Sequence, residues 1–258
     1  ANPGGGTYRW GADGIVDEAR IASAVRSPNW VWACWRNQLY NNTFCTYGAV
    51  SGLSINNSGG ASSITTNSVT LNGSLTVTGG TPAEVWVYWG QSDGGPGAAS
   101  WSRTNYFGTN AQSCPVFYST NVAISPGAYY YYRYCARDAD VTAWSKTAAS
   151  FISGPVSIQA ADASASETAP DTGTFTVDRP AGLTNEALTV NYAVGGTATA
   201  GSDYQALPGS VIIPAGATSA VINVTPIDDT LRYENTESVV ASLVAGQYVI
   251  GATATATV

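Results

Sequence analysis

Several carboxylates of residues 155–258 lie close together in the sequence, where they could bind a metal ion. Asp228 and Asp229 are adjacent, and Glu234 and Glu237 follow them three residues apart. Carboxylates this close repel one another unless a cation offsets their charge. Hard oxygen ligands on flexible turns suit Ca²⁺, which takes about six to eight of them. The pattern therefore indicates a Ca²⁺ site, and the alternative is a solvated acidic rim.

Catalysis is the second chemistry that these acids could serve. A glycosidase places one carboxyl group on each side of the scissile bond. Adjacent aspartates on a turn, with further acids around them, fit metal ligation better. The chain has no histidine, which removes Ser-His and Cys-His dyads and imidazole ligands, and Lys146 is its only lysine. We therefore expect a protein that is not an enzyme.

Short strands must position these acids. Residues 155–258 contain segments that alternate apolar and polar residues or are rich in β-branched residues, with turns between them. The segments are Val156–Ala160, Gly173–Val177, Leu188–Tyr192, Ser210–Ile213, Ala220–Val224 and Ser238–Leu243. About seven strands in about 100 residues is the spacing of a β-sandwich. The 28 glycines and the abundance of Thr, Ser, Val and Tyr extend the all-β prediction to the whole chain, as β-sandwich modules in tandem.

Composition divides the 258 residues into parts. Residues 155–258 carry ten acids and two arginines, a formal charge of −8, whereas residues 1–154 carry a charge of +1. All four cysteines and all eight tryptophans precede Gly154-Pro155, which is a natural boundary. A softer boundary lies near Ser51-Gly52. The predicted domains are 1–50, 51–153 and 154–258.

Motifs spread over residues 155–258 point to one family. They are Ala165-Ser166-Glu167, Gly195-Gly196-Thr197-Ala198, Gly201-Ser202-Asp203-Tyr204, Ile213-Pro214-Ala215-Gly216, Ile227-Asp228-Asp229 and Glu234-Asn235-Thr236-Glu237. In this order they resemble a Calx-β domain, the calcium-binding sandwich of sodium–calcium exchanger regulatory regions and of many bacterial surface proteins. The resemblance implies side-chain ligands at Glu167, Asp203, Asp228, Asp229, Glu234 and Glu237, and a carbonyl ligand at Leu231. Multi-ion members carry further aspartates after the final strand, where this sequence ends at Val258, so we expect one or two Ca²⁺ ions.

Residues 51–153 contain three further strand patterns. Residues 64–73 lead through a turn into an alternating strand, and residues 84–90 form a strand whose Trp and Tyr residues we expect in a sandwich core. Residues 124–137 lead from Ser125-Pro126-Gly127 into a tyrosine-rich strand. This last segment resembles a fibronectin type III or related Ig-like domain, in which Tyr130 takes the tyrosine-corner position and ties a loop to its strand.

The faces of the tyrosine-rich strand follow from its alternation. If Tyr130, Tyr132 and Tyr134 face inward, then Tyr129 and Tyr131 face outward, together with Arg133, Cys135 and Arg137. The outward tyrosines could contact a sugar or a partner protein. The favoured interpretation is an ordinary amphipathic strand that loops cover.

Residues 1–50 read as a strand over residues 13–21, a short helix that starts at Ser27-Pro28, and a strand over residues 44–50. This order of elements resembles the C-terminal end of a laminin-G or concanavalin-like lectin domain. Fifty residues are too few to bury several tryptophans alone. We therefore expect either that the segment is the remainder of a longer domain or that Trp30, Trp32 and Trp35 contact a partner or a sugar.

The four cysteines indicate an oxidising, extracellular setting. None of them form a C-x-x-C motif, and three pairings into two disulfides are possible. The preferred pairing is Cys34–Cys45 with Cys114–Cys135, because each pair then lies within one predicted domain.

Two hypotheses about function follow. The leading one is a bacterial surface protein with a structural or adhesive role, stabilised by Ca²⁺ and assembled with other copies of itself into a filament by head-to-tail strand contacts. The alternative is a carbohydrate-binding part of a large secreted enzyme or adhesin, with a polysaccharide as its partner. The scarcity of basic residues predicts no nucleic-acid partner, and the lack of a long apolar run predicts no membrane insertion.

Overall fold

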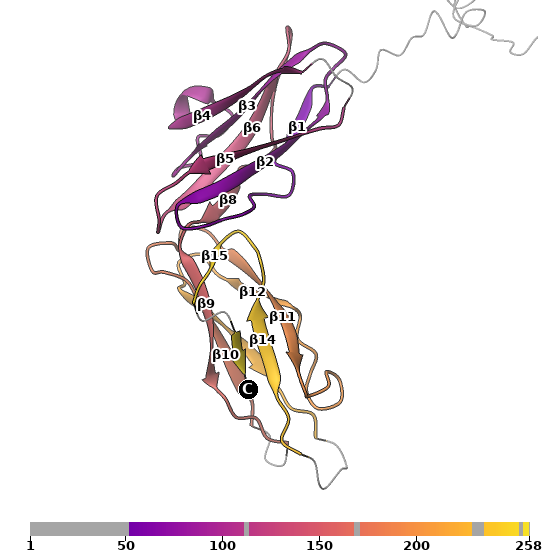
Figure 1. Cartoon of the computed structure of the whole chain (residues 1–258), viewed down its shortest axis with the longest axis vertical. Coiled ribbons are helices and arrows are strands. Elements are labelled where there is room, and N and C mark those ends of the chain that lie inside the picture. The colour runs from indigo at the N-terminus through magenta and orange to yellow at the C-terminus, as the bar shows by residue number, and fades with distance from the viewer. Residues whose placement is uncertain (1–51, 111–113, 168–170, 229–234, 253–254, 258) are drawn as a thin grey trace, which may run out of the picture. The chain divides into compact units, whose positions relative to one another are not determined.

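The computed structural model describes residues 52–257 apart from 111–113, 168–170, 229–234 and 253–254 (Figure 1). Residues 49–258 form one compact unit. The strands and the short helix predicted within residues 1–50, with Trp30, Trp32 and Trp35, lie outside the described residues. In the described part of the chain, no helix is long and apolar enough to cross a membrane.

The unit of residues 49–258 is built from strands, which confirms the all-β prediction, and its first part is a β-sandwich over residues 54–152, the first sandwich. One sheet has the order β1-β2-β5, and the other has the order β4-β3-β6-β7 with β8 paired to β6. The elements are β1 (Ser54–Asn56), β2 (Ser68–Val77), β3 (Ala83–Gly90), the 3-10 helix η1 (Ala98–Ser100), β4 (Arg103–Asn110), β5 (Val116–Ala123), β6 (Tyr129–Arg137), β7 (Thr142–Trp144) and β8 (Ala149–Ile152).

The tyrosines of β6 join the two sheets of the first sandwich. Tyr130, Tyr132 and Tyr134 face the core, as the alternation predicts. The Tyr134 hydroxyl donates a hydrogen bond to the Leu71 carbonyl of β2 over 2.9 Å. The Tyr130 hydroxyl accepts a hydrogen bond from the Ser125 amide over 2.8 Å. This is the contact predicted for a tyrosine corner, and it fixes the loop that enters β6.

The aromatic residues of β3 divide between the two faces of their sheet. Trp89 lies in the core with Val85 and Val87, whereas Trp86 and Tyr88 are only partly buried and lie on the outer face. The prediction that all these rings lie in the core is therefore wrong for Trp86 and Tyr88. Strict alternation along β3 gives the inward positions to valines and turns the two rings outward.

The second sandwich spans residues 155–257 and follows β8 directly. Its sheets have the orders β13-β10-β9-β15 and β12-β11-β14-β16. The strands are β9 (Pro155–Asp162), β10 (Gly173–Asp178), β11 (Leu188–Gly196), β12 (Ser210–Ile213), β13 (Ser219–Val224), β14 (Val239–Leu243), β15 (Val249–Ile250) and β16 (Thr255–Thr257). All pairs in these sheets are antiparallel except β15 with β9.

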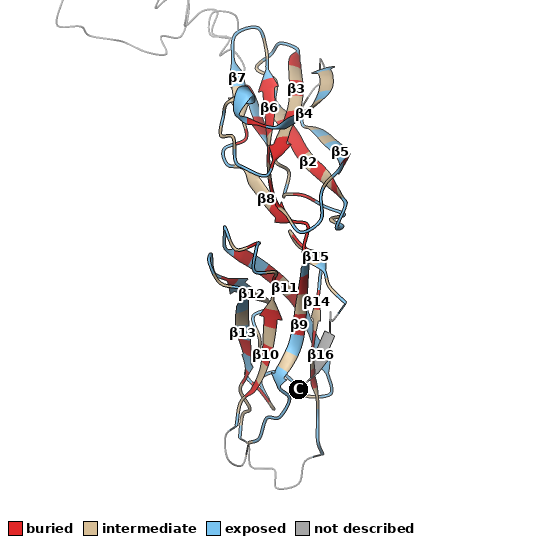
Figure 2. Ribbon diagram, turned by 90° about the vertical axis from the view of Figure 1, so that its left-hand side faces the viewer, coloured by how far each residue is buried: buried red, intermediate tan, exposed pale blue. Residues whose placement is uncertain are grey.

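Alternating apolar residues build the core of the second sandwich. Phe175 and Val177 of β10 face Val190 and Tyr192 of β11 within one cluster of buried residues, and polar residues take the positions between them. Figure 2 shows the buried positions recurring along the strands of both sandwiches. Burial of these apolar side chains is the main source of stability for such a domain.

Residues of the first sandwich complete this core. Tyr129 and Ile152 belong to the buried cluster of the second sandwich. The Ile152 amide donates to the Gln247 carbonyl over 3.0 Å. The Gln247 side-chain amide accepts from the Ala61 amide and donates to the Ala61 carbonyl, each over 3.0 Å. The two sandwiches are therefore joined by apolar contact and by paired hydrogen bonds, in addition to the chain itself.

Candidate metal centre

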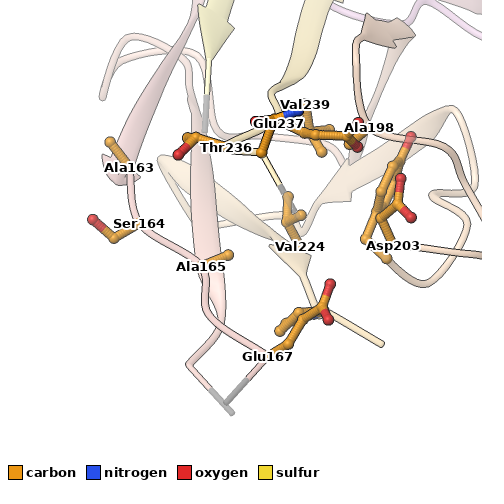
Figure 3. A pocket seen from close by; sticks show the side chains of 13 residues that line it. Ala163, Ser164, Ala165, Glu167, Ala198, Asp203, Val224, Thr236, Glu237 and Val239 are labelled. Atoms are coloured by element: carbon orange, nitrogen blue, oxygen red, sulfur yellow. The ribbon is translucent and has the colours of Figure 1, made fainter. Parts of the chain in front are cut away.

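A hollow of about 390 Å³ lies where several loops and strand ends of the second sandwich meet. Three carboxylates, Glu167, Asp203 and Glu237, line it from three separate segments of the chain. Figure 3 shows them on different sides of the hollow, around Val224. The other lining residues are Ala163, Ser164, Ala165, Ala198, Tyr204, Pro226, Asn235, Thr236 and Val239.

Asp203 is held by a compact turn between β11 and β12. Its carboxylate Oδ2 accepts a hydrogen bond from the Thr199 amide over 2.6 Å, and its carbonyl accepts from the Ile227 amide over 2.9 Å. The next residue, Tyr204, is buried and pairs with Ala200 and Pro226. These contacts fix the direction of the Asp203 side chain beside the hollow.

Glu237 stands next to a close approach between β11 and the chain that enters β14. Gly196 has a φ of 115°, and a Cβ atom at this position would lie 2.0 Å from the Ser238 carbonyl oxygen. The Thr197 and Ala198 amides both donate to that carbonyl, over 2.9 and 3.1 Å. Only glycine fits such a conformation and contact, so this glycine holds the Glu237 segment beside the Asp203 turn.

Glu167 lies in the loop between β9 and β10. Ser166 and Asp171 exchange two backbone hydrogen bonds, of 3.1 and 3.0 Å, that close this loop. Glu167 itself is half-buried. The loop therefore brings a third carboxylate to the hollow from the sheet that does not contain β11 and β14.

The predicted ligands have different outcomes. The structure brings Glu167, Asp203 and Glu237 to one hollow, whereas Asp228 is exposed and is not among the lining residues. Asp229, Leu231 and Glu234 lie outside the described residues. Within the described ranges, no three Asp, Glu, Cys or His side chains are close enough together to hold a metal ion by themselves.

The donor set nevertheless has the chemistry of a hard-cation site. Three carboxylates face one cavity, and none of the described residues that line it is basic. Asn235, Thr236 and Ser164 add neutral oxygen donors that the sequence interpretation did not assign. The sequence could have indicated Asn235 and Thr236, because they directly precede the predicted ligand Glu237. A cation with several oxygen ligands would offset the repulsion among the carboxylates.

The tyrosines proposed as outward contacts are covered. Tyr129 is only 6% exposed and belongs to the core of the second sandwich, so it is not available to a sugar or a partner. Tyr131 packs against the same core, and its hydroxyl donates to Glu186 Oε1 over 3.4 Å. Burial raises the pKa of Tyr131 to about 12, and the nearby Glu186 carboxylate adds to the effect. Both rings face outward as predicted, but the neighbouring sandwich covers them.

The predicted disulfide between Cys114 and Cys135 is not formed, because both residues are free cysteines. Cys114 packs against the core of the first sandwich, whereas Cys135 lies on the outer face of β6, opposite Trp86 and Trp144. The sheet therefore stands between the two sulfur atoms. Burial raises the pKa of the Cys135 thiol to about 12. Cys34 and Cys45 lie outside the described residues.

Comparisons with known proteins found a family match in the second sandwich. Residues 153–258 match the family model of the Calx-beta domain. The crystal structure of the apo-form Calx CBD1 domain is 18% identical, with a TM-score of 0.31 over 40% of this chain and 94% of that chain. The crystal structure of CBD12 from CALX1.2 is 11% identical, with a TM-score of 0.29 over 74% of this chain and 92% of that chain. A search of the curated proteins found no match.

Proposed function

We propose that the Calx-beta domain formed by residues 153–258 binds Ca²⁺ in the hollow lined by Glu167, Asp203 and Glu237. The observation that carries the proposal is the convergence of these three carboxylates, from three segments, on one cavity. The sequence adds Asp229, Leu231 and Glu234 as candidate ligands from the segment between Val224 and Glu237, whereas the exposed Asp228 does not line the hollow, and we propose one or two ions.

The chemistry of the site supports calcium. Ca²⁺ takes about six to eight oxygen ligands in flexible geometry, and it accepts carboxylate, carbonyl and hydroxyl oxygens together. Two of the segments are fixed by hydrogen bonds at Asp203 and Ser238, so part of the site is preorganised. The formal charge of −8 on residues 155–258 favours a divalent cation further.

The role of the bound ion is to join segments that are otherwise separate. The loop of Glu167 leaves one sheet, and the segments of Asp203 and Glu237 belong to the other. A shared cation would fix the two sheets to each other at this end of the sandwich. We infer a structural or adhesive protein that acts outside the cell, in which calcium makes the tandem sandwiches rigid.

Assembly with other copies of the same chain completes the proposal. Each sheet of the second sandwich ends in a strand with an open edge, β12 in one sheet and β13 in the other. These edge strands expose Ile212 and Val221, at 59% and 55%. Open edges with apolar residues favour pairing with a further strand. Electron microscopy of the purified chain with Ca²⁺ tests this step: ordered fibres support it, and uniformly separate particles contradict it.

The calcium site is tested by thermal unfolding of the full chain in Ca²⁺ and in chelator. At a free Ca²⁺ concentration about 100-fold above Kd, binding stabilises the folded state by about 2.7 kcal/mol. For a domain of this size, that stabilisation raises Tm by roughly 10 °C or more. Asp203→Asn should remove most of this shift. Equal Tm values for the wild-type chain in Ca²⁺ and in chelator would contradict the proposal.

Asp178→Asn provides the matched control. Asp178 is the last residue of β10 and pairs with Ser219, whereas the first residue, Gly173, pairs with Val224 in the hollow. The control therefore removes one carboxylate from the opposite end of the same strand. It should leave the calcium-dependent shift in Tm unchanged.

A further inference from the structure

Four aromatic side chains lie together on the outer surface of the sheet β4-β3-β6-β7 in the first sandwich. They are Trp86, Tyr88, Tyr106 and Trp144, and we call this surface the aromatic face. Tyr106 is 54% exposed, and the other three rings are half-buried. The alternate residues of the same strands, such as Val85, face the core. The rings are therefore not required to fill the interior of the sandwich.

Strand register places three of these rings in one row. Tyr106 is opposite Trp86, Trp86 is opposite Cys135, and Cys135 is opposite Trp144. The row crosses four strands, which are about 4.8 Å apart, and so extends over roughly 14 Å. The short Cys135 side chain is buried between the larger rings. Trp86 lies 5.1 Å from Tyr106, and Tyr88 lies 5.0 Å from Trp144, between ring centroids.

Paired charges frame the rings. Arg137 forms a 2.7 Å ion pair with Glu84, and its guanidinium lies 5.2 Å from the centre of the Trp86 ring. The Tyr106 hydroxyl donates to Glu84 Oε1 over 3.1 Å. Arg133 contacts both carboxylate oxygens of Asp93, over 3.3 and 3.1 Å. Each guanidinium beside the face is matched by a carboxylate, so these charges balance locally.

We propose that the aromatic face binds a neutral polysaccharide chain. The apolar C–H surface of a sugar ring packs against an aromatic ring, as other apolar groups do. The carboxylate of Glu84 and the guanidinium of Arg137 are held beside Trp86, where they offer acceptors and donors to sugar hydroxyls. The platform is flat and extends over several strands, which suits a chain ligand.

The balanced charges distinguish this ligand from other classes of partner. A nucleic acid or an acidic polysaccharide is held by arginines without carboxylate partners, and Arg133 and Arg137 both have one. An apolar protein surface would remove water from both ion pairs, which costs free energy without replacing their hydration. Sugar hydroxyls can replace that water. The proposal does not depend on calcium binding by the second sandwich.

The test is affinity electrophoresis of the full chain in native gels that contain hydroxyethylcellulose, xylan or galactomannan, with polygalacturonate as the acidic comparison. We expect retardation by at least one neutral polysaccharide. Trp86→Ala and Tyr106→Ala should each raise the Kd for that polysaccharide about tenfold or more, because truncating an aromatic anchor removes most of its contact area. Tyr106 lies on the edge strand β4 and is half-exposed, so its variant keeps the test valid if Trp86→Ala does not fold.

Phe117→Ala is the matched control. Phe117 is 72% exposed and lies on β5, in the other sheet of the first sandwich, so its loss should leave retardation unchanged. Three results would overturn the proposal. They are migration unaffected by all three neutral polysaccharides, retardation by polygalacturonate alone, and retardation that both Trp86→Ala and Tyr106→Ala retain at full strength. Self-association lost in Trp86→Ala, without polysaccharide binding, would instead assign the face to a second copy of the chain.

Discussion

Arg179 offers a quantitative test of how the second sandwich is held together. It follows β10 and is only 4% exposed. Its guanidinium donates three hydrogen bonds to backbone carbonyls: to Ala217 over 3.0 Å, and to Glu186 and Pro214 over 2.7 Å each. These bonds tie the loop before β11 and the turn between β12 and β13 to the end of β10. Replacement of Arg179 by Met removes all three while keeping most of the apolar stem.

The expected loss follows from the number and type of bonds. A hydrogen bond with a charged partner contributes about 1.5–3 kcal/mol, so three contribute roughly 5–9 kcal/mol before desolvation is considered. Burial of the guanidinium opposes this, and it lowers the pKa of Arg179 as well. Removing the arginine also removes that desolvation cost, so the free energy of unfolding should fall by a net amount of about 3–5 kcal/mol. For a domain of this size, Tm should fall by at least about 12 °C.

Circular dichroism and tryptophan fluorescence together provide the assay. All eight tryptophans lie within residues 1–144, so fluorescence reports on the first part of the chain and circular dichroism reports on both sandwiches. Arg179→Met should lower the midpoint of the circular dichroism transition more than that of fluorescence. Arg103→Met is the control, because Arg103 is exposed and its guanidinium lies 5.3 Å from the centre of the Trp89 ring. This variant should lower the free energy of unfolding by only about 1 kcal/mol or less. If Arg179→Met lowered the free energy of unfolding by less than about 1 kcal/mol, the reasoning would be refuted.

Three further predictions concern single contacts. Gly196→Ala should lower stability by about 2–4 kcal/mol in urea unfolding, because its Cβ would lie 2.0 Å from the Ser238 carbonyl at a φ of 115°; unchanged stability would contradict this. Tyr130→Phe should lower the free energy of unfolding by about 1–2 kcal/mol, since the Ser125 amide loses its acceptor. An unfolding free energy equal to that of the wild-type chain would show that water replaces the bond. Burial raises the pKa of Tyr131 from 10.0 to about 12. The stability that its neutral hydroxyl contributes is therefore complete below pH 10.0 and is lost as the pH rises toward 12. Tyrosinate absorbance and circular dichroism should change together above pH 10.0.

Strand positions were well predicted because they depend on local alternation. The predicted strand Ser210–Ile213 has the same bounds as β12, and Gly173–Val177 differs from β10 by one residue. The inward and outward faces of β6 also follow from alternation alone. The hydrogen bond at Tyr130 was predicted for a similar reason, since a tyrosine corner joins residues that are close in sequence.

Long-range packing explains what sequence reasoning missed. Tyr129 faces outward from its own sheet, but a neighbouring sandwich covers it, and no local pattern reports that contact. The predicted disulfide between Cys114 and Cys135 rests only on the two residues lying in the same domain. Two sulfur atoms can bond only if their side chains also lie on the same face of the sheet. Residue type alone places the rings of Trp86 and Tyr88 in the core, but they alternate with the valines of β3 and therefore point outward.

The candidate site shows the same division. The acids were expected between strands, and the motifs selected Glu167, Asp203 and Glu237, which share one hollow. Sequence motifs carry this information because each acid is tied to a fixed local turn, such as the one closed at Thr199 by Asp203. The exposed position of Asp228 depends instead on how its segment lies against the rest of the domain.

The central claim is that the acidic hollow binds Ca²⁺, and isothermal titration calorimetry tests it most directly. Titration of Ca²⁺ into the chelator-treated full chain should show saturable binding of one or two ions. Asp203→Asn should raise the Kd about tenfold or more, whereas Asp178→Asn should leave it unchanged. Absence of saturable heat in the wild-type chain, or equal Kd values for the wild-type chain and Asp203→Asn, would contradict the claim.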